Sequence, residues 1–214
     1  SFDANGGTGS MPKQTIHTDE IAKLVANTFA KAGYTFVGWA TAPDGKKVYN
    51  DTQSIEMGME SFTLYAVWKA KINTIRFDAN GGSGEAFSQD IATDETRVLT
   101  KNTYTKNGYA FVGWATTPSG AIAYADQASY TMGTEASYTI YAVWKLADYS
   151  ISYDLNGGVG DENPTTYNML SDSFTLYSPT RPGYTFLGWS GTGIEGIRMT
   201  VTVETGSFGE RSYT

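Results

Sequence analysis

Three stretches of the chain place an aspartate beside a cluster of glycines, a combination that can bind phosphate or calcium. They are "FDANGGTG" at 2–9, "FDANGGSG" at 77–84 and "YDLNGGVG" at 153–160. A phosphate-binding loop opens a helix and usually carries a lysine, and 77–84 contains none. A calcium-binding EF-hand loop needs a glutamate at position 12, but counting from Asp78 that position is Gln89. We therefore predict a hairpin turn, because Asn and Gly tolerate positive φ.

Two pairs of adjacent carboxylates, Asp19–Glu20 and Asp94–Glu95, could in principle perform glycosidase chemistry. Each pair follows a threonine at a predicted helix start, where negative charge stabilises the helix dipole. The only histidine is His17, and there is no cysteine. This composition excludes Ser-His-Asp triads and most zinc sites. We expect His17 to be solvated, and we predict no catalytic residue, no cofactor and no metal site.

Five tryptophans could stack on sugar rings, and all five lie in predicted strands at matched positions. Three of them follow a glycine, which would let a large ring lie over the backbone. We interpret the tryptophans as residues that pack inside or between structural units, and we keep glycan contact as the alternative. The five are Trp39, Trp68, Trp114, Trp144 and Trp189, and the glycines are Gly38, Gly113 and Gly188.

Lysine–asparagine cross-links would need a Lys, an Asn and a carboxylate that recur together at strand positions. Lys69 and Lys145 do recur, but just past the predicted last strand, and the final third of the chain has no counterpart. We therefore predict that no such cross-link forms.

Three sequence phrases return with one period, so the chain is a tandem array. The glycine phrase recurs after 75 and 76 residues, and "GYTFVGW" at Gly33 returns as "GYAFVGW" at Gly108 and as "GYTFLGW" at Gly183. "LYAVWK" also has a second copy, "IYAVWK". This period is too long for a helical solenoid unit and suits a small domain with its own core. The predicted repeats are 1–70 (first strand truncated), 71–146, and 147–214 (a variant with a truncated final strand).

The composition is that of a globular protein, with 40% hydrophobic and 14% aromatic residues among 214. Aromatic residues bury much area each, which suits units near the lower size limit for a stable core. The net charge is −7, without a basic stripe, which argues against nucleic-acid binding. No apolar run approaches the ~20 residues of a membrane span, and there is no signal peptide. Because repeats 1 and 3 look truncated, we expect a signal or anchor to lie outside this stretch.

Within the second repeat the pattern predicts strands in 73–79, around 86–91, in 107–115 and in 137–145, with a short strand or loop in 121–132. A short helix is predicted for 93–104, and its counterpart at 18–29 has Ile21, Leu24 and Val25 at helical spacing. The order predicts an α+β unit, a small mixed sheet with one helix packed across it. The third repeat instead carries a predicted strand in 198–206.

The set "FDANGG…GYTFVGW…LYAVWK" resembles the Listeria–Bacteroides repeat family, and its longer spacing is similar to the B-repeat of internalin-type surface proteins. The resemblance covers nearly the whole chain. It implies a β-grasp-like (ubiquitin-like) fold, secretion, and a place in modular proteins of the bacterial cell surface. It implies no enzymatic activity, and the family has no catalytic residues to transfer to this sequence.

The linkers "KAKIN" and "KLADYS" contain no Gly-Ser run and should limit bending. With a radius of gyration of roughly 11 Å per repeat, stacked copies predict a semi-rigid rod of roughly 100 Å. We expect a non-enzymatic spacer that presents another domain at the bacterial surface. The alternative is an adhesive module that binds a host glycan or protein. The expected partners are the neighbouring repeats, without nucleic acid or membrane insertion.

Overall fold

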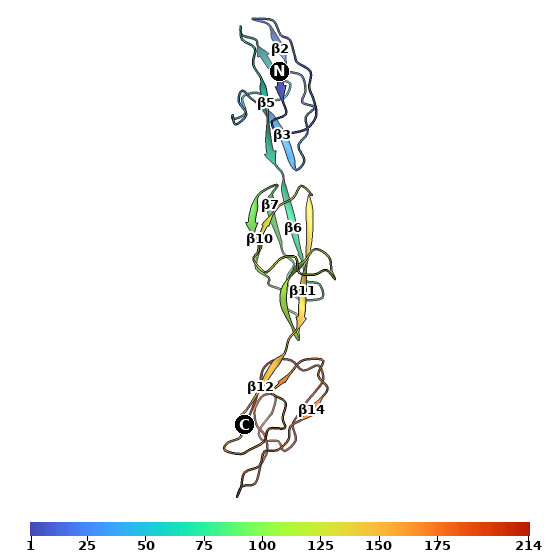
Figure 1. Ribbon diagram of the computed structural model, residues 1–214, viewed down its shortest axis with the longest axis vertical. Coiled ribbons are helices and arrows are strands. Elements are labelled where there is room, and N and C mark those ends of the chain that lie inside the picture. The colour runs from blue at the N-terminus through green and yellow to red at the C-terminus, as the bar shows by residue number, and fades with distance from the viewer. The chain divides into compact units, whose positions relative to one another are not determined.

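The computed structural model describes residues 1–214 as an all-β chain with sixteen strands. The first repeat contains β1 (Phe2–Asp3), β2 (Ile21–Lys23), β3 (Tyr34–Ala40), β4 (Ser54–Glu56) and β5 (Leu64–Ala70). The second contains β6 (Ile72–Asp78), β7 (Ser88–Ala92), β8 (Thr96–Val98), β9 (Tyr109–Ala115), β10 (Ser129–Thr131) and β11 (Ser137–Leu146). The third contains β12 (Tyr149–Tyr153), β13 (Thr166–Tyr167), β14 (Phe174–Thr175), β15 (Thr202–Val203) and β16 (Arg211–Tyr213). Figure 1 labels the main strands.

The chain divides into two compact units whose boundary runs through the second repeat. One unit comprises 1–76, 87–100 and 127–139, and the other comprises 77–86, 101–126 and 140–214. The link between repeats 1 and 2 therefore lies inside the first unit. The link between repeats 2 and 3 lies inside the second.

In the first repeat, the central strand β5 pairs with β1 in parallel and with β3 in antiparallel orientation, while β2 and β4 form a separate pair. The core lies against the sheet and is centred on Trp39, which is fully buried. Its ring contacts those of Phe2 and Phe36, each at 4.9 Å between centroids. Large aromatic rings thus form the centre of this small core.

In the second repeat the strand order is β7-β6-β11-β9, with β8 and β10 as a further pair. Asn73, Ile75 and Phe77 are buried on alternate positions of β6, as the period of a half-buried strand requires. Strands β6, β7, β9 and β11 confirm the strand predictions for this repeat, and β10 confirms the short fourth one.

The predicted helix is absent, so the α+β assignment, a β-grasp-like mixed sheet with one helix per repeat, is wrong. Within 93–104 the chain forms a turn and then β8, which pairs with β10; within 18–29 it forms β2, which pairs with β4. Asp94 and Asp19 at the turns have φ of 64° and 62°, which a right-handed helix cannot accommodate. Strand partners that are distant in sequence override the local helical spacing.

The third repeat has the order β13-β12-β16, with β14 and β15 as a further pair. Strand β16 lies parallel to β12, with Tyr213 opposite Tyr153, as Leu64 of β5 lies opposite Phe2 of β1. Of the strand predicted in 198–206, only Thr202–Val203 forms. Val201 and Val203 are buried, but Met199 is exposed.

Candidate functional sites in the repeats and at their junctions

The Asp-x-Asn-Gly stretches form tight turns. Asn80 and Gly81 have φ of 47° and 81°, both in the left-handed region, and the other two repeats show the same pair of values within a few degrees. The Asp78 carboxylate accepts a hydrogen bond of 2.7 Å from the Asn80 backbone N–H, which stabilises the turn. The Asn80 side chain donates to the carbonyls of Pro118 and Ala142, at 2.7 and 2.9 Å. The turn prediction is confirmed, and the Asp78 and Asn80 side chains make their hydrogen bonds to the protein backbone.

The tryptophans occupy two kinds of position. Trp39, Trp114 and Trp189 are fully buried, each at the centre of its repeat. Trp68 and Trp144 are half-buried, and their indole N–H groups donate to the carbonyls of Ala4 and Ala79 at 2.9 and 2.8 Å. These positions confirm the packing interpretation. The rings that are fully buried are inaccessible to a sugar.

The glycine before each buried tryptophan has a role that differs from the predicted one. Gly38 has a φ of 139°, and a Cβ atom there would collide with the carbonyl oxygen of Tyr49. Tyr49 and Trp39 form a β-bridge, so the backbone at Tyr49 runs too close to Gly38 to leave room for a side chain there. The sequence predicted a ring over the glycine, but the neighbour is a crossing backbone.

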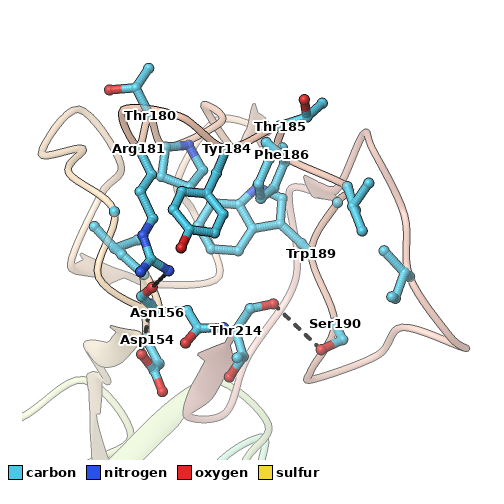
Figure 2. A pocket seen from close by; sticks show the side chains of 16 residues that line it. Asp154, Asn156, Thr180, Arg181, Tyr184, Thr185, Phe186, Trp189, Ser190 and Thr214 are labelled. Atoms are coloured by element: carbon cyan, nitrogen blue, oxygen red, sulfur yellow. Dashed lines mark hydrogen bonds between the residues drawn. The ribbon is translucent and has the colours of Figure 1, made fainter.

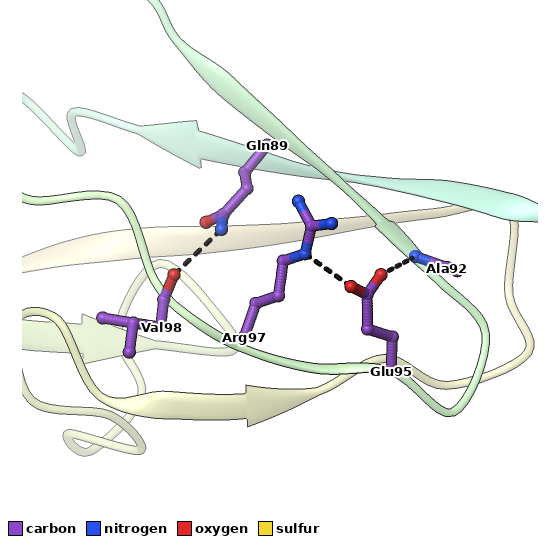
Figure 3. Close-up of polar contacts among 5 residues, drawn as sticks. All are labelled: Gln89, Ala92, Glu95, Arg97 and Val98. Carbon is purple, nitrogen blue, oxygen red and sulfur yellow. Dashed lines mark hydrogen bonds and ion pairs between the residues drawn. The ribbon is translucent and has the colours of Figure 1, made fainter.

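The paired carboxylates stabilise turns, not helices. The Glu95 carboxylate accepts a 3.0 Å hydrogen bond from the Ala92 backbone N–H and a 2.7 Å ion pair from Arg97 (Figure 3). The backbone hydrogen bond, reinforced by Arg97, lowers the pKa of Glu95. In the first repeat Glu20 accepts in the same way from the backbone N–H of His17, whose side chain is exposed. The helix-dipole interpretation of these carboxylates is therefore wrong.

The junction between repeats 1 and 2 is tightly hydrogen-bonded. Lys71 alone separates β5 from β6; its N–H donates to the carbonyl of Gly33, and its carbonyl accepts from the N–H of Thr93, both at 2.9 Å. The hydroxyl of Tyr34 donates to the Asp94 carboxylate at 2.8 Å. This hydrogen bond raises the pKa of Tyr34. The sequence did not predict these contacts, because residues such as Tyr34 and Asp94 lie 60 positions apart.

Side-chain packing closes the same junction. Thr93 is buried, and a Cβ atom on Gly33 would come within 2.5 Å of its methyl group. The buried Asn73 donates to the Thr93 hydroxyl at 2.9 Å and to the carbonyl of Gly133 at 3.0 Å. The first repeat therefore contacts a polar cluster of the second that is already fully hydrogen-bonded.

The junction between repeats 2 and 3 uses the same backbone contact with different side chains. The N–H of Ala147 donates to the carbonyl of Gly108 at 3.0 Å, the counterpart of the Lys71–Gly33 bond. Met169 lies against Gly108, where a Cβ atom would collide with its sulfur. Asn168 donates to the Asp148 carboxylate at 2.8 Å. An apolar contact at Gly108 thus replaces the threonine contact at Gly33.

The third repeat carries a groove of about 320 Å³ beside residues 184–190. Figure 2 shows Tyr184, Phe186 and Trp189 near one another, with the Arg181 guanidinium reaching the carbonyl of Asn156 at 2.8 Å. Arg181 also lies over the Tyr184 ring, 4.0 Å from its centroid. Tyr184 is 67% exposed. The sequence did not predict this groove.

The structure brings no three His, Cys, Asp or Glu side chains together in a group that could hold a metal ion. It likewise contains no helix long and apolar enough to span a membrane. Lys69 and Lys145 lie at matched positions of β5 and β11, inside those strands and not past them as predicted.

Three similar all-β repeats, each with a fully buried tryptophan and joined through hydrogen-bonded junctions, define a tandem-repeat protein. A sequence profile of the Listeria-Bacteroides repeat domain matches residues 1–67, 74–143 and 149–202. The chain therefore belongs to the Listeria-Bacteroides repeat family, as its resemblance predicted.

Three relatives place these repeats in larger proteins. A protein of Evansella cellulosilytica named as a Gly-rich membrane protein is 32% identical over 194 residues, covering 85% of this chain and 22% of that protein. Another protein of that organism, named as a membrane protein, is 27% identical over 205 residues and covers 89% and 28%. Internalin H of Listeria monocytogenes is 33% identical over 85 residues, covering 40% and 15%. The chain thus spans less than a third of each relative.

Proposed function

We propose that this chain is a non-enzymatic spacer in a bacterial cell-surface protein, where it holds another domain at a distance from the cell. The proposal depends mainly on one observation: at each junction the backbone that joins two repeats is hydrogen-bonded to a repeat. In a flexible linker, by contrast, the backbone N–H and C=O groups are hydrogen-bonded to water. Links that are hydrogen-bonded in this way limit the rotation of one repeat relative to the next.

The first junction argues most strongly for limited bending. Both backbone groups of Lys71 are hydrogen-bonded, and the Tyr34–Asp94 hydrogen bond lies beside them. Rotation of one repeat against the other would break these contacts together. Each backbone hydrogen bond has a net value of about 0.5–1.5 kcal/mol in a typical protein, and the contacts together oppose free rotation.

The relatives support a location at the cell surface. Two are named as membrane proteins and one as an internalin. The repeats carry no group of residues that suggests a reaction, and the relatives' names describe no enzyme. Extracellular placement and presentation of another domain are part of this proposal.

The test is to change the number of repeats in the parent protein. Deleting one repeat or duplicating one should shorten or lengthen the distance between the cell and the presented domain, as measured by super-resolution localisation of labels on both. The presented domain should keep its own binding affinity. If the measured distance does not change with repeat number, the chain is not a spacer.

An adhesive module is the second candidate, favoured by exposed aromatic side chains of the third repeat. Its Tyr177 and Phe208 are 60% and 49% exposed, and aromatic rings with accessible faces can pack against a host glycan or protein. Arrays of glycans and of host proteins, probed with the 214-residue chain, test this function. Absence of binding at high micromolar concentrations of the chain would leave the spacer as the only candidate.

A further inference from the structure

One asparagine–glycine pair lies outside the Asp-x-Asn-Gly turns, at the junction between repeats 2 and 3. It is Asn107–Gly108. In such a pair the backbone nitrogen of the glycine can attack the side-chain amide of the asparagine, because glycine has no Cβ atom to obstruct the approach. The pair is therefore a candidate for chemical modification of the chain.

Asn107 and Gly108 are the two central residues of a turn. The N–H of Tyr109 donates to the carbonyl of Lys106 at 3.0 Å, and Gly108 has a φ of 76°, as in a type II turn. The N–H of Gly108 donates no hydrogen bond. The Asn107 side chain is exposed and makes no hydrogen bond either. No hydrogen bond therefore restrains the amide or occupies the nitrogen that would attack it.

Asn80, which also precedes a glycine in the second repeat, is held differently. Its side-chain NH₂ group donates to the carbonyls of Pro118 and Ala142, at 2.7 and 2.9 Å. This NH₂ group is the one that would leave as ammonia during deamidation. Both hydrogen bonds must break before it leaves, so the same dipeptide is restrained at Asn80 and unrestrained at Asn107.

The turn itself does not require an asparagine. The first and third repeats form the same turn with Ala32 and Pro182 in place of Asn107. The following glycines, Gly33 and Gly183, have φ of 75° and 80°. Only the second repeat therefore combines this turn with a side chain that can deamidate.

We propose that Asn107 is a site of spontaneous deamidation, and that its isoaspartate product loosens the junction between repeats 2 and 3. The deprotonated backbone nitrogen of Gly108 attacks the side-chain carbonyl carbon of Asn107, and ammonia leaves. The product is a five-membered succinimide. Water then opens this ring: attack at the backbone carbonyl gives isoaspartate, and attack at the side-chain carbonyl gives aspartate. One water is consumed and one ammonia is released, and no electron is transferred.

Isoaspartate changes the backbone where the junction is tightest. It leads the chain through the former side chain and so adds one methylene group to the backbone just before Gly108. The carbonyl of Gly108 accepts the 3.0 Å hydrogen bond from Ala147, and a Cβ atom on Gly108 would collide with the sulfur of Met169. A displaced Gly108 cannot keep both contacts. This inference does not depend on the spacer role.

The experiment incubates the 214-residue chain at mildly alkaline pH, which favours the deprotonated nitrogen, and follows each asparagine by peptide mapping with mass spectrometry. Asn107 should convert at least about fivefold faster than Asn80, because two hydrogen bonds of ordinary net strength oppose the reaction there. The product should include isoaspartate. Hydrogen exchange of the Ala147 amide should then be several-fold faster in the aged chain, while exchange of the Lys71 amide at the other junction stays unchanged.

Two variants serve as controls. Asn107→Ala reproduces the turn of the first repeat, and its Ala147 amide should keep its protection during incubation. Asn107→Asp carries the charge of the product on a normal backbone, and it should protect Ala147 as the fresh chain does. Conversion of Asn107 no faster than that of Asn80, formation of aspartate alone, or unchanged exchange of Ala147 in the aged chain would each overturn the proposal. So would the same acceleration in aged Asn107→Ala or in fresh Asn107→Asp.

Discussion

At the scale of single residues, one fully buried tryptophan lies at the centre of each repeat. Trp39 and Trp189 are fully buried, and their indole N–H groups have no hydrogen-bond acceptor. Burying an unsatisfied N–H costs free energy, so the gain from packing must exceed that cost. The rings around Trp39 lie at 4.9–6.2 Å between centroids, the range of favourable aromatic contacts.

Replacing Trp39 with alanine should lower the free energy of unfolding of the first repeat by about 3–5 kcal/mol, because it leaves a large cavity. Trp68→Phe, which keeps an aromatic ring but loses the hydrogen bond to Ala4, should cost only about 1 kcal/mol. Urea denaturation followed by tryptophan fluorescence measures both. Equal losses in the two variants would contradict the central role of Trp39.

Gly38→Ala should destabilise the first repeat by at least about 1–3 kcal/mol, since the residue has a φ of 139° and its Cβ would collide with the Tyr49 carbonyl. Gly58→Ala is the control, because nothing lies within 4 Å of a Cβ atom there. That variant should change stability by less than about 0.5 kcal/mol. Thermal denaturation compares them, and a neutral Gly38→Ala would refute the close approach.

The third repeat should lose stability at high pH through Tyr153. Burial, reinforced by the charge of Tyr213, raises the pKa of Tyr153 from 10.0 to about 12. A raised pKa means that folding favours the neutral phenol, so this contribution is complete below pH 10 and disappears as the pH rises through about 12. Spectrophotometric titration of Tyr153→Phe should lack this late step. Persistence of the step in the variant would show that another tyrosine is responsible.

At the scale of elements, the first two repeats share one tight turn, which in the second repeat forms a junction surface. The turns at Asp19 and Asp94 have matching φ, and each donates its backbone N–H to a methionine carbonyl, at 2.8 and 2.9 Å. In the second repeat this turn contacts Tyr34 and Gly33 of the first. An element that sequence spacing favours as a helix is thus a turn followed by a short strand, and in the second repeat that turn meets the neighbouring repeat.

Gly33→Ala should loosen the junction between repeats 1 and 2. Gly33 and Gly183 have similar φ, 75° and 80°, so alanine strains the backbone equally at both. Only at Gly33 does the new methyl group meet Thr93, whereas nothing lies within 4 Å at Gly183. Hydrogen exchange of the Lys71 and Thr93 amides should therefore accelerate in Gly33→Ala and stay unchanged in Gly183→Ala. Equal protection in both variants would show that the junction does not depend on this contact.

At the scale of the whole molecule, ion pairs contribute little. The single ion pair joins Arg97 to Glu95, and both side chains are substantially exposed, at 54% and 36%. Exposed pairs contribute little and are screened by salt. The repeats are therefore held mainly by buried apolar surface and backbone hydrogen bonds.

A tenfold increase in sodium chloride should consequently leave the midpoint of urea denaturation unchanged or slightly higher, because salt screens the repulsion among the acidic groups. Circular dichroism at a β-sheet wavelength follows the transition. A clear fall in the midpoint with salt would mean that charge pairs contribute more than the structure indicates.

The sequence alone determined the three repeats, the family, the turns after β1, β6 and β12, and the strands β6, β9 and β11. These features follow from local rules: Asn-Gly pairs tolerate positive φ, and alternating apolar residues make half-buried strands. Tertiary structure decided that 18–29 and 93–104 are strands and turns. It also decided that Tyr34 meets Asp94 and that a groove opens beside Tyr184. Each depends on contacts between residues far apart in sequence. The spacing of neighbouring residues does not indicate which distant residues will be in contact.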